Sequence, residues 1–369
     1  MSAESFTPLQ ALSALGQSVW IDSISRDSIR GGHLQGLIDH DAVVGATSNP
    51  TIFQKAMTGS DAYDEQLREL DASDIAQTFW VLAEQDVREA CDVFAPVFER
   101  TERRDGYVSL EVDPRLAYDT LASFREAIRL HEEVDRPNLL VKIPATRPGL
   151  GAIEDAIAAG RSINITLIFS LSRYAEVAEC YVRGIERLVA EGRDPGPVDS
   201  VASFFVSRID TEADRRLDEL GGHDELKGKL AVANARLAYE HYKQVFAGPR
   251  WEYLVSKGAT PQRVLWASTS TKNPAYPDVM YVEELIGPDT VNTMPEETVR
   301  AYQDHGEPQA RLERGLEEAH RVFTELAAAG VDYDDVTDTL EREGVEKFSE
   351  SFDDLLAALA ERLQAPTAA

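Results

Sequence analysis

The sequence predicts an α/β protein built as a (β/α)8 barrel, or TIM barrel, with additional C-terminal helices. About eight short runs of β-forming residues alternate with helical patterns, and a long helical stretch follows the last run. Parallel strands need a long crossover connection, so strands that alternate with helices favour a parallel sheet. An open doubly wound sheet also fits this alternation, but eight strand–helix repeats favour closure into a barrel.

The predicted strands are short runs rich in Val, Ile, Leu and Phe. They lie at Val19–Asp22, Val43–Thr47, Tyr107–Val112, Leu139–Ile143, Ile163–Phe169, Ser200–Val206, Val264–Ser268 and Thr290–Thr293. Between them, apolar residues at three- and four-residue spacing indicate amphipathic helices that can each cover one face of the sheet. The clearest are Ile75–Glu99, Arg115–Glu133, Tyr174–Ala190 and Leu230–Phe246.

The chain continues well beyond the eighth predicted strand. Gln309–Ala329 and Val345–Leu363 have helical patterns, and no linker or low-complexity tract precedes them. Barrels commonly reach 369 residues, so the length does not demand a second domain. We therefore interpret residues 1–369 as a single domain, with 295–369 a helical extension packed on the barrel.

Composition excludes several classes of protein. No apolar run approaches the roughly 20 residues that span a bilayer, and Met1–Gln17 lacks the pattern of a signal peptide, so we expect a cytoplasmic protein. The 65 acidic and 37 basic side chains give a formal net charge of −28, which opposes binding to nucleic acid or to an anionic membrane. An anionic substrate would therefore need a local cluster of Arg or Lys. A monomer or a homodimer is expected.

The sequence indicates neither a metal nor a cofactor. The two cysteines, Cys91 and Cys180, are far apart and are expected to be small buried hydrophobes. The seven histidines form no clustered ligand set. The glycine-containing segments Gly149–Gly151 and Gly222–Lys229 lack the spacing of nucleotide-binding loops. We predict a site without metal or cofactor.

Lys142 is the most informative candidate for a reactive residue. It lies in the predicted strand Leu139–Ile143 between residues expected to be buried, and reactive groups of such barrels sit at the carboxyl ends of strands. Desolvation of its ammonium group is costly and favours the neutral amine, the nucleophile that forms a Schiff base with a carbonyl compound. A structural lysine that snorkels or forms a salt bridge is the alternative interpretation.

Two carboxylates occupy comparable positions on other strands. Asp22 ends one predicted strand and Glu111 lies inside another, and Schiff-base chemistry needs general acids and bases of this kind. Asp22 could instead cap a helix over Ile24–Arg30, and Glu111 could pair with an arginine of the barrel.

Hydroxyl and amide side chains recur at the same ends of strands, where they suit a polyhydroxylated ligand. They are Thr47, Asn49, Asn164, Thr166 and Ser203. Asn49 before Pro50 is also typical of a helix N-cap, and Asn164 and Thr166 share one face of a strand, where they could instead hydrogen-bond inside the barrel.

An anionic group has its own candidates after the sixth and seventh strands, where phosphate sites often lie in barrels. Arg208 follows one strand, and Ser268 and Lys272 lie in the polar stretch after the next. Arg208 could instead pair with Asp210 or Asp214. The segment Thr211-Glu-Ala-Asp214 resembles a capping box that would open the following helix.

At these residues the chain resembles the transaldolase family, over about Val19 to Met294. Three separate motifs carry the resemblance, Gly45-Ala-Thr-Ser-Asn-Pro-Thr-Ile-Phe53, Leu139-Leu-Val-Lys-Ile-Pro-Ala-Thr146 and Ile163-Asn-Ile-Thr-Leu-Ile-Phe-Ser170. The length of the C-terminal segment is similar to the larger, actinobacterial-like members. The resemblance implies a (β/α)8 fold and transfer of dihydroxyacetone between sugar phosphates. The alternatives are a fructose-6-phosphate aldolase and a catalytically silent barrel that serves as a binding subunit.

The resemblance also implies roles for individual residues. Lys142 would form the Schiff base, Asp22 would act as acid and base in carbon–carbon cleavage, and Glu111 with Thr166 would position a water. Asn49, Asn164 and Ser203 would hold substrate hydroxyls, and Arg208 and Ser268 would bind phosphate. Phe205 stands where related fructose-6-phosphate aldolases carry Tyr, which favours transfer. The family's Ala-Ser-Phe-Arg-Asn appears here as Ala267-Ser-Thr-Ser-Thr-Lys-Asn273, so Lys272 would replace that arginine only with two extra loop residues.

Overall fold

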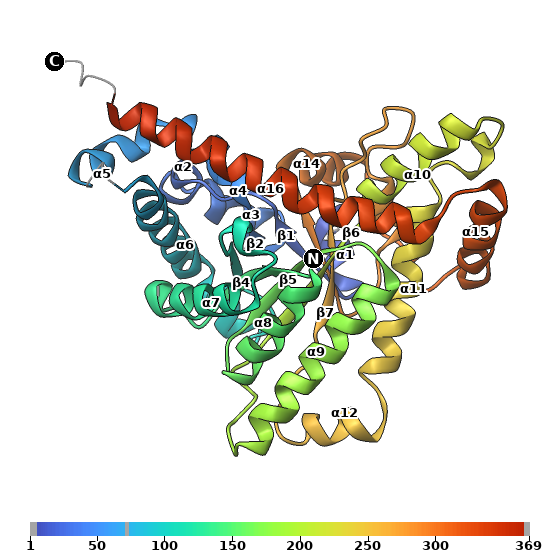
Figure 1. The fold of residues 1–369 in the computed structure, drawn as a ribbon, viewed down its shortest axis with the longest axis horizontal. Helices are drawn as coiled ribbons and strands as arrows, with labels where there is room; N and C mark the ends of the chain where they lie inside the picture. The colour runs from blue at the N-terminus through green and yellow to red at the C-terminus, as the bar shows by residue number, and fades with distance from the viewer. Residues whose placement is uncertain (1–5, 71–73, 365–369) are drawn as a thin grey trace, which may run out of the picture.

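The computed structural model describes residues 6–70 and 74–364, and its centre is a closed barrel of eight parallel strands (Figure 1). Each strand pairs with the next along the chain, and the first pairs with the last over Gln17–Ile21 and Thr290–Met294. The predicted (β/α)8 barrel is therefore confirmed. Residues 1–5, in the segment tested for a signal peptide, and residues 365–369, in the predicted extension, lie outside the described residues.

Every observed strand overlaps a predicted one. The strands are β1 Gln17–Ile21, β2 Val43–Thr47, β3 Val108–Glu111, β4 Leu139–Pro144, β5 Ile163–Ile168, β6 Ser200–Phe205, β7 Arg263–Ala267 and β8 Thr290–Met294. Asp22, predicted inside the first strand, follows β1, although its amide still donates to the Met294 carbonyl at 2.8 Å. The carboxyl end of β1 thus presents Asp22 at the mouth of the barrel.

Helices form the outer layer between the strands. They are α1 Pro8–Ala14, α2 Arg26–Arg30, α3 His33–His40, α4 Pro50–Thr58, α5 Asp64–Glu69, α6 Ile75–Arg100, α7 Thr120–Val134, α8 Arg147–Ala158, α9 Leu171–Ala190, α10 Ser207–Leu220, α11 Leu230–Val245, α12 Gly248–Val255 and α13 Met280–Glu284. The predicted helix Arg115–Glu133 begins too early, because a 3-10 turn, η2 Pro114–Leu116, comes first and Asp119 then caps α7. Two further 3-10 turns of the same length occur at η1 Asp61–Tyr63 and η3 Asp224–Leu226.

Three helices follow β8, namely α14 Glu296–His305, α15 Leu316–Ala329 and α16 Tyr333–Gln364. The predicted start of α15 at Gln309 is wrong, because the amides of Arg311 and Leu312 bond to the Ile286 carbonyl and Gly315 begins the helix in a left-handed conformation. The predicted start of the last helix at Val345 is also wrong, since α16 has 32 residues and begins at Tyr333.

Helix α16 runs across one end of the molecule, from beside α15 to beyond α4 and α5 (Figure 1). It contacts α4, α6, α10 and β5, so it lies over the carboxyl end of the barrel. Phe352 packs against Phe79 and Trp80 of α6 with ring centroids 5.1 and 6.2 Å away. The predicted extension thus packs on the barrel, while its interpretation as part of one domain stays a prediction.

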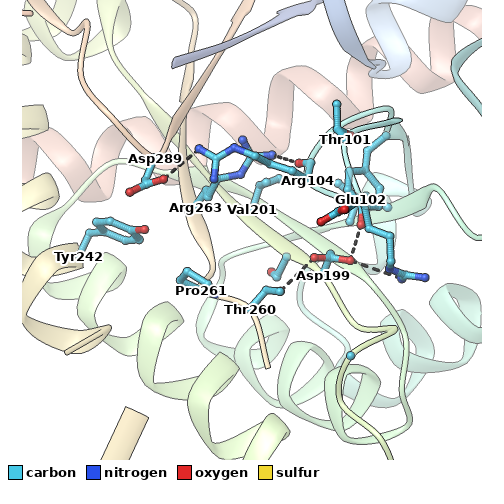
Figure 2. A pocket seen from close by; sticks show the side chains of 15 residues that line it. Thr101, Glu102, Arg104, Asp199, Val201, Tyr242, Thr260, Pro261, Arg263 and Asp289 are labelled. Atoms are coloured by element: carbon cyan, nitrogen blue, oxygen red, sulfur yellow. Dashed lines mark hydrogen bonds and ion pairs between the residues drawn. The ribbon is translucent and has the colours of Figure 1, made fainter. Parts of the chain in front are cut away.

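A cavity opens at the opposite, amino end of the barrel (Figure 2). It is lined by residues that precede or begin strands, among them Arg104, Asp199, Arg263 and Asp289. Arg104 is paired with Asp289 at 2.9 Å and Arg103 with Asp199 at 3.5 Å, so these four charges of the lining are matched in pairs. Functional sites of barrels lie at the carboxyl end of the strands, and this cavity lies at the other end.

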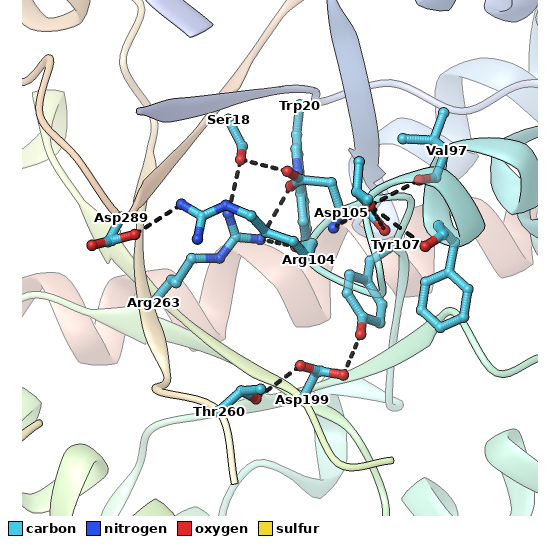
Figure 3. Close-up of polar contacts among 12 residues, drawn as sticks. Ser18, Trp20, Val97, Arg104, Asp105, Tyr107, Asp199, Thr260, Arg263 and Asp289 are labelled. Carbon is cyan, nitrogen blue, oxygen red and sulfur yellow. Dashed lines mark hydrogen bonds and ion pairs between the residues drawn. The ribbon is translucent and has the colours of Figure 1, made fainter. Parts of the chain in front are cut away.

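A buried polar network closes the barrel below that cavity (Figure 3). Arg263 forms an ion pair with Asp105 at 3.1 Å and donates to the Ser18 hydroxyl at 2.8 Å. Asp105 also accepts from Ser18 and from the Trp20 indole at 2.8 and 3.0 Å. Each buried charge therefore has a partner, which is the condition for keeping such groups in the interior.

Three further findings concern residues 6–70 and 74–364 only. Both cysteines are buried and free, as expected. No group of three or more His, Cys, Asp or Glu side chains there could hold a metal ion. No helix in this part of the chain is long and apolar enough to cross a membrane.

Candidate active site

A second cavity lies at the carboxyl ends of the strands and brings the predicted site residues together. Ten of them line it, namely Asp22, Thr47, Asn49, Lys142, Thr166, Ser203, Phe205, Arg208, Ser268 and Lys272. The other two contact its lining, since Glu111 lies 3.2 Å from Lys142 and Asn164 accepts a hydrogen bond from Ser203. Residues from seven strands and their following loops thus meet in one place.

Lys142 projects from β4, whose six residues are all buried. Its ammonium group donates to the Ser48 carbonyl at 2.9 Å and lies 3.2 Å from a Glu111 carboxylate oxygen. Glu111 and Lys142 are directly paired in the β3–β4 register, so the sheet itself sets this contact. Lys142 therefore does form a salt bridge, as one interpretation expected, but it also lines the cavity and is 5% exposed.

Glu111 combines burial with unused hydrogen-bonding capacity. Burial raises the pKa of its carboxyl, and the Lys142 ammonium opposes this shift. Apart from the ion pair, its oxygens make no hydrogen bond to a described residue, and the same holds for the Thr166 hydroxyl. The alternative partner, an arginine of the barrel, is wrong because the paired strand supplies Lys142 instead. Glu111 and Thr166 can therefore both bind a water beside the lysine.

Asp22 lines the same cavity from the segment that follows β1. The Thr47 hydroxyl donates to its carboxylate at 2.6 Å and lies 2.6 Å from the Thr293 hydroxyl. Burial raises the pKa of Asp22, and the charge of Lys142 opposes this effect. The alternative role as a helix cap is wrong, since Ser25 caps α2. Asp22 is thus oriented by Thr47 and available for proton transfer.

Amide and hydroxyl side chains complete the inner wall. Asn164 donates to the Ser109 hydroxyl at 3.0 Å and accepts from Ser203 at 2.7 Å, so the predicted hydrogen bonding inside the barrel does occur. Asn49 accepts from the Ile52 amide at 3.0 Å as the N-cap of α4, and it also lines the cavity. The N-cap interpretation of Asn49 is therefore confirmed, and its role in binding hydroxyl groups stays a prediction.

Arg208 stands at the start of α10 without an acidic partner. It forms no hydrogen bond or ion pair within the described part of the chain, and its guanidinium carbon lies 5.3 Å from the centroid of the Phe205 ring. Pairing with Asp210 or Asp214 is wrong, because those carboxylates accept from Tyr281 and Tyr276 instead.

The predicted capping box at Thr211 is also wrong. Helix α10 begins earlier, at Ser207, and its N-cap position makes no side-chain bond. The Thr211 hydroxyl donates to the Ser207 carbonyl at 3.0 Å, as a threonine inside a helix often does. This early start places Arg208 in the first turn of α10, at the rim of the cavity.

The loop after β7 brings a second cation to the same rim. Lys272 donates to the Ser270 hydroxyl at 2.7 Å and has no ion pair with a described residue. Partial desolvation, and then the nearby charge of Arg208, lower the pKa of Lys272. Ser268 adopts a left-handed conformation with φ of 57°, and its hydroxyl lies 2.9 Å from that of Ser207. Two cations without acidic partners suit an anionic group, despite the net charge of −28.

Sequence reasoning missed three residues that line this cavity, namely Thr293, Pro295 and Phe348. Thr293 lies in the predicted last strand, and an inward hydroxyl there is a signal of the same kind as Thr166. Phe348 comes from α16, and its sequence context does not indicate a site residue, because an apolar residue at helical spacing is normally expected to pack in the hydrophobic core.

Comparison with known proteins now assigns this constellation to a family. The profile of the family described as transaldolase/fructose-6-phosphate aldolase matches residues 19–359, which include every residue of the cavity. The chain belongs to this transaldolase/fructose-6-phosphate aldolase family. The match reaches beyond the barrel and includes most of α16.

Curated relatives from actinobacteria share nearly the whole length of this family member. A protein from Acidothermus cellulolyticus is 54% identical over 361 residues, covering 97% of this chain and 97% of the relative. Relatives from Frankia alni and Saccharopolyspora erythraea are 52% and 51% identical, each covering 96% of this chain and 97% of the relative. All three are named transaldolase. The predicted similarity to larger, actinobacterial members is confirmed.

Proposed function

We propose that this enzyme is a transaldolase that transfers a dihydroxyacetone unit through a Schiff base on Lys142. The donor would be sedoheptulose 7-phosphate and the acceptor glyceraldehyde 3-phosphate, giving erythrose 4-phosphate and fructose 6-phosphate, a step of the non-oxidative pentose phosphate pathway. One observation carries the proposal: a buried lysine at the carboxyl end of β4 lies 3.2 Å from a buried carboxylate, in a cavity lined by two cations, Arg208 and Lys272, that have no ion pair with a described residue. The full-length relatives named transaldolase support it.

In the first step, the neutral amine of Lys142 attacks the ketone carbon of the donor. Glu111 takes one proton of the ammonium group and returns it to the leaving hydroxyl through a water held with Thr166, so that the carbinolamine loses water and becomes a protonated imine. A carboxyl whose pKa is raised by burial is suited to both directions of this transfer, because it takes up a proton more readily than an exposed carboxyl does.

Cleavage then needs a base on the other side of the substrate. Asp22 would accept the proton of the C4 hydroxyl while the C3–C4 bond breaks and its electrons move into the protonated imine, which becomes a neutral enamine. The aldehyde fragment leaves, and the enamine attacks the aldehyde carbon of the acceptor while Asp22 returns the proton. Hydrolysis of the new imine through Glu111 releases the product and restores Lys142.

The remaining residues of the cavity would bind and select the sugar phosphate. Arg208, Lys272 and Ser268 form the phosphate end, and Asn49, Asn164, Ser203 and Thr47 face the chain of hydroxyls. Phe205 has no hydroxyl with which to protonate the enamine, which favours transfer over release of free dihydroxyacetone. The proposed reaction needs no metal or cofactor. We further propose that the enzyme is cytoplasmic, that it is a monomer or a homodimer, and that it binds no nucleic acid.

Borohydride reduction tests the proposal directly. With fructose 6-phosphate present, reduction should leave a stable adduct on the peptide that contains Lys142, and mass analysis should find none in a Lys142→Met control. An unmodified Lys142 peptide in the wild-type protein would sink the mechanism. A product assay without acceptor separates a transferase from an aldolase, since only the aldolase releases free dihydroxyacetone steadily.

A further inference from the structure

Helix α16 contributes a single aromatic side chain, Phe348, to the cavity at the carboxyl end of the barrel. Phe348 is 5% exposed and lines both the inner cavity and the wider mouth outside it. Arg208 and Lys272 line the same two spaces. The ring therefore lies where the proposed phosphate end of the site meets solvent.

Arg208 lies against two aromatic rings rather than against an acid. Its guanidinium carbon is 5.3 Å from the centroid of Phe205 and 6.0 Å from that of Phe348, both within reach of a cation–π interaction. The charges of Asp22 and of Glu343 on α16 also act on Arg208, but neither forms an ion pair with it, and Glu343 pairs with Lys347 at 2.9 Å. The rings can restrict the flexible arginine without neutralising its charge, whereas a carboxylate would compete with an incoming anion.

Contacts outside the site hold α16 in place on both sides of Phe348. Towards the helix start, Glu341 pairs with Arg173 at 3.3 Å. Towards its end, the Ser351 hydroxyl accepts from Thr51 at 2.9 Å, and Arg362 pairs with Asp64 at 2.7 Å. The position of the ring is thus set by the scaffold and not by the ligand.

A glycine brings the helix close to the barrel one turn before the ring. A Cβ atom added at Gly344 would lie 3.0 Å from a side-chain carbon of Leu167, tighter than ordinary van der Waals contact. Leu167 follows Thr166 at the end of β5 and has a φ of 58°. A larger residue at position 344 would therefore require the Leu167 side chain to shift by a few tenths of an ångström.

We propose that Phe348 is a positioning residue that, together with Phe205, orients the Arg208 guanidinium for the phosphate of the substrate and so strengthens the preference for phosphorylated donors. This inference rests on the proposed function, and it assigns to the C-terminal helix a part in substrate selection.

The test compares Phe348→Leu with the wild-type enzyme on fructose 6-phosphate and on fructose. Losing one ring should raise the KM for fructose 6-phosphate and the inhibition constant of inorganic phosphate by roughly two- to thirtyfold, the range of a single cation–π contact. The kcat and the reaction with fructose should stay within about twofold. Phe348→Tyr, which keeps the ring, should restore the KM. Phe348→Met provides a second ring-free side chain if the leucine variant does not fold.

Phe352→Leu is the matched control, because Phe352 lies one turn further along α16 and packs on α6 instead of on Arg208. It should lower thermal stability and change both donors equally. In an Arg208→Ala background, Phe348→Leu should cause no further rise in the inhibition constant of phosphate. An equal loss for both donors, an unchanged phosphate constant, or the same rise without Arg208 would overturn the inference. Failure of the proposed function is separate, because it would appear as a missing Lys142 adduct in the wild-type protein.

Discussion

Glu111→Gln tests the proposed proton transfer at Lys142 most directly, because it exchanges one carboxylate oxygen for an amide group of nearly the same shape. In the structure this carboxylate lies 3.2 Å from the Lys142 ammonium, and both side chains are at least 94% buried. Its oxygens have no other hydrogen-bond partner among the described residues, so few other contacts are lost. The substitution therefore removes the acid and base and the charge partner of the lysine together.

The expected magnitudes follow from this geometry. General acid–base catalysis contributes about 10²- to 10⁴-fold, so kcat should fall by that factor, or roughly 3–5 kcal/mol in the barrier. Removing one member of a buried ion pair also costs about 3–5 kcal/mol of folding stability, because the remaining charge keeps only the Ser48 carbonyl. The KM for fructose 6-phosphate should change little, since Arg208 and Lys272 are untouched.

Three measurements separate these effects. Steady-state transfer to glyceraldehyde 3-phosphate gives kcat and KM, borohydride quenching at short times gives the rate of Schiff-base formation, and thermal unfolding gives the stability. Glu111→Asp is the control, because it keeps the carboxyl one methylene further back and should retain intermediate activity. A glutamine variant that is less stable but keeps kcat within about threefold of the wild type would refute the reasoning, since Glu111 would then serve only as a charge partner.

Two further predictions concern the phosphate end and a buried acid. Arg208→Ala should raise the KM for fructose 6-phosphate by roughly ten- to a hundredfold, because the loss of one charged hydrogen bond has this effect, and it should change the reaction with fructose little. Equal losses for both donors in kinetic assays would show that Arg208 does not bind the phosphate. Burial raises the pKa of Asp210 to about 7 from the ordinary 3.8, so the folded protein holds this proton more tightly than the unfolded chain does. The free energy of unfolding should therefore decrease, by roughly 4 kcal/mol at most, as the pH rises from about 4 to about 7. Asp210→Asn should abolish this pH-dependent part of the free energy of unfolding. Denaturant titrations at pH 5 and pH 8 measure it, and an equal change in stability between the two pH values in the wild type and the variant would contradict the prediction.

The sequence was most informative where the local pattern and the chemistry agree. Alternating apolar runs and helices located all eight strands, because each strand buries its side chains and so shows a continuous apolar run. Lys142, Glu111 and Thr166 stood out because polar side chains in such runs need a reason to be there. The common geometry of parallel barrels, in which all strands end on one side, then allowed residues far apart in sequence to be grouped in one site.

The errors share a different cause. The early start predicted for α15 and the late start predicted for α16 occur where backbone amides or side chains find partners in distant segments, such as Arg311 with the Ile286 carbonyl. Helix propensity is a weak local preference that tertiary contacts override. The capping roles predicted for Asp22 and Thr211 were wrong for the same reason, because they depend on the residue at which a helix begins.

The sequence by itself determined the barrel, the family resemblance, and the lysine with its two carboxylates. Only the tertiary structure decided that Arg208 and Lys272 have no acidic partner among the described residues, that Glu111 faces Lys142 at 3.2 Å, and that α16 places Phe348 beside Arg208 in the cavity. Phe348 and Arg208 are separated by 140 positions in the chain, and nothing in the pattern around either residue specifies the other. Such contacts arise from how whole elements pack, so they become visible only when the packed structure is known.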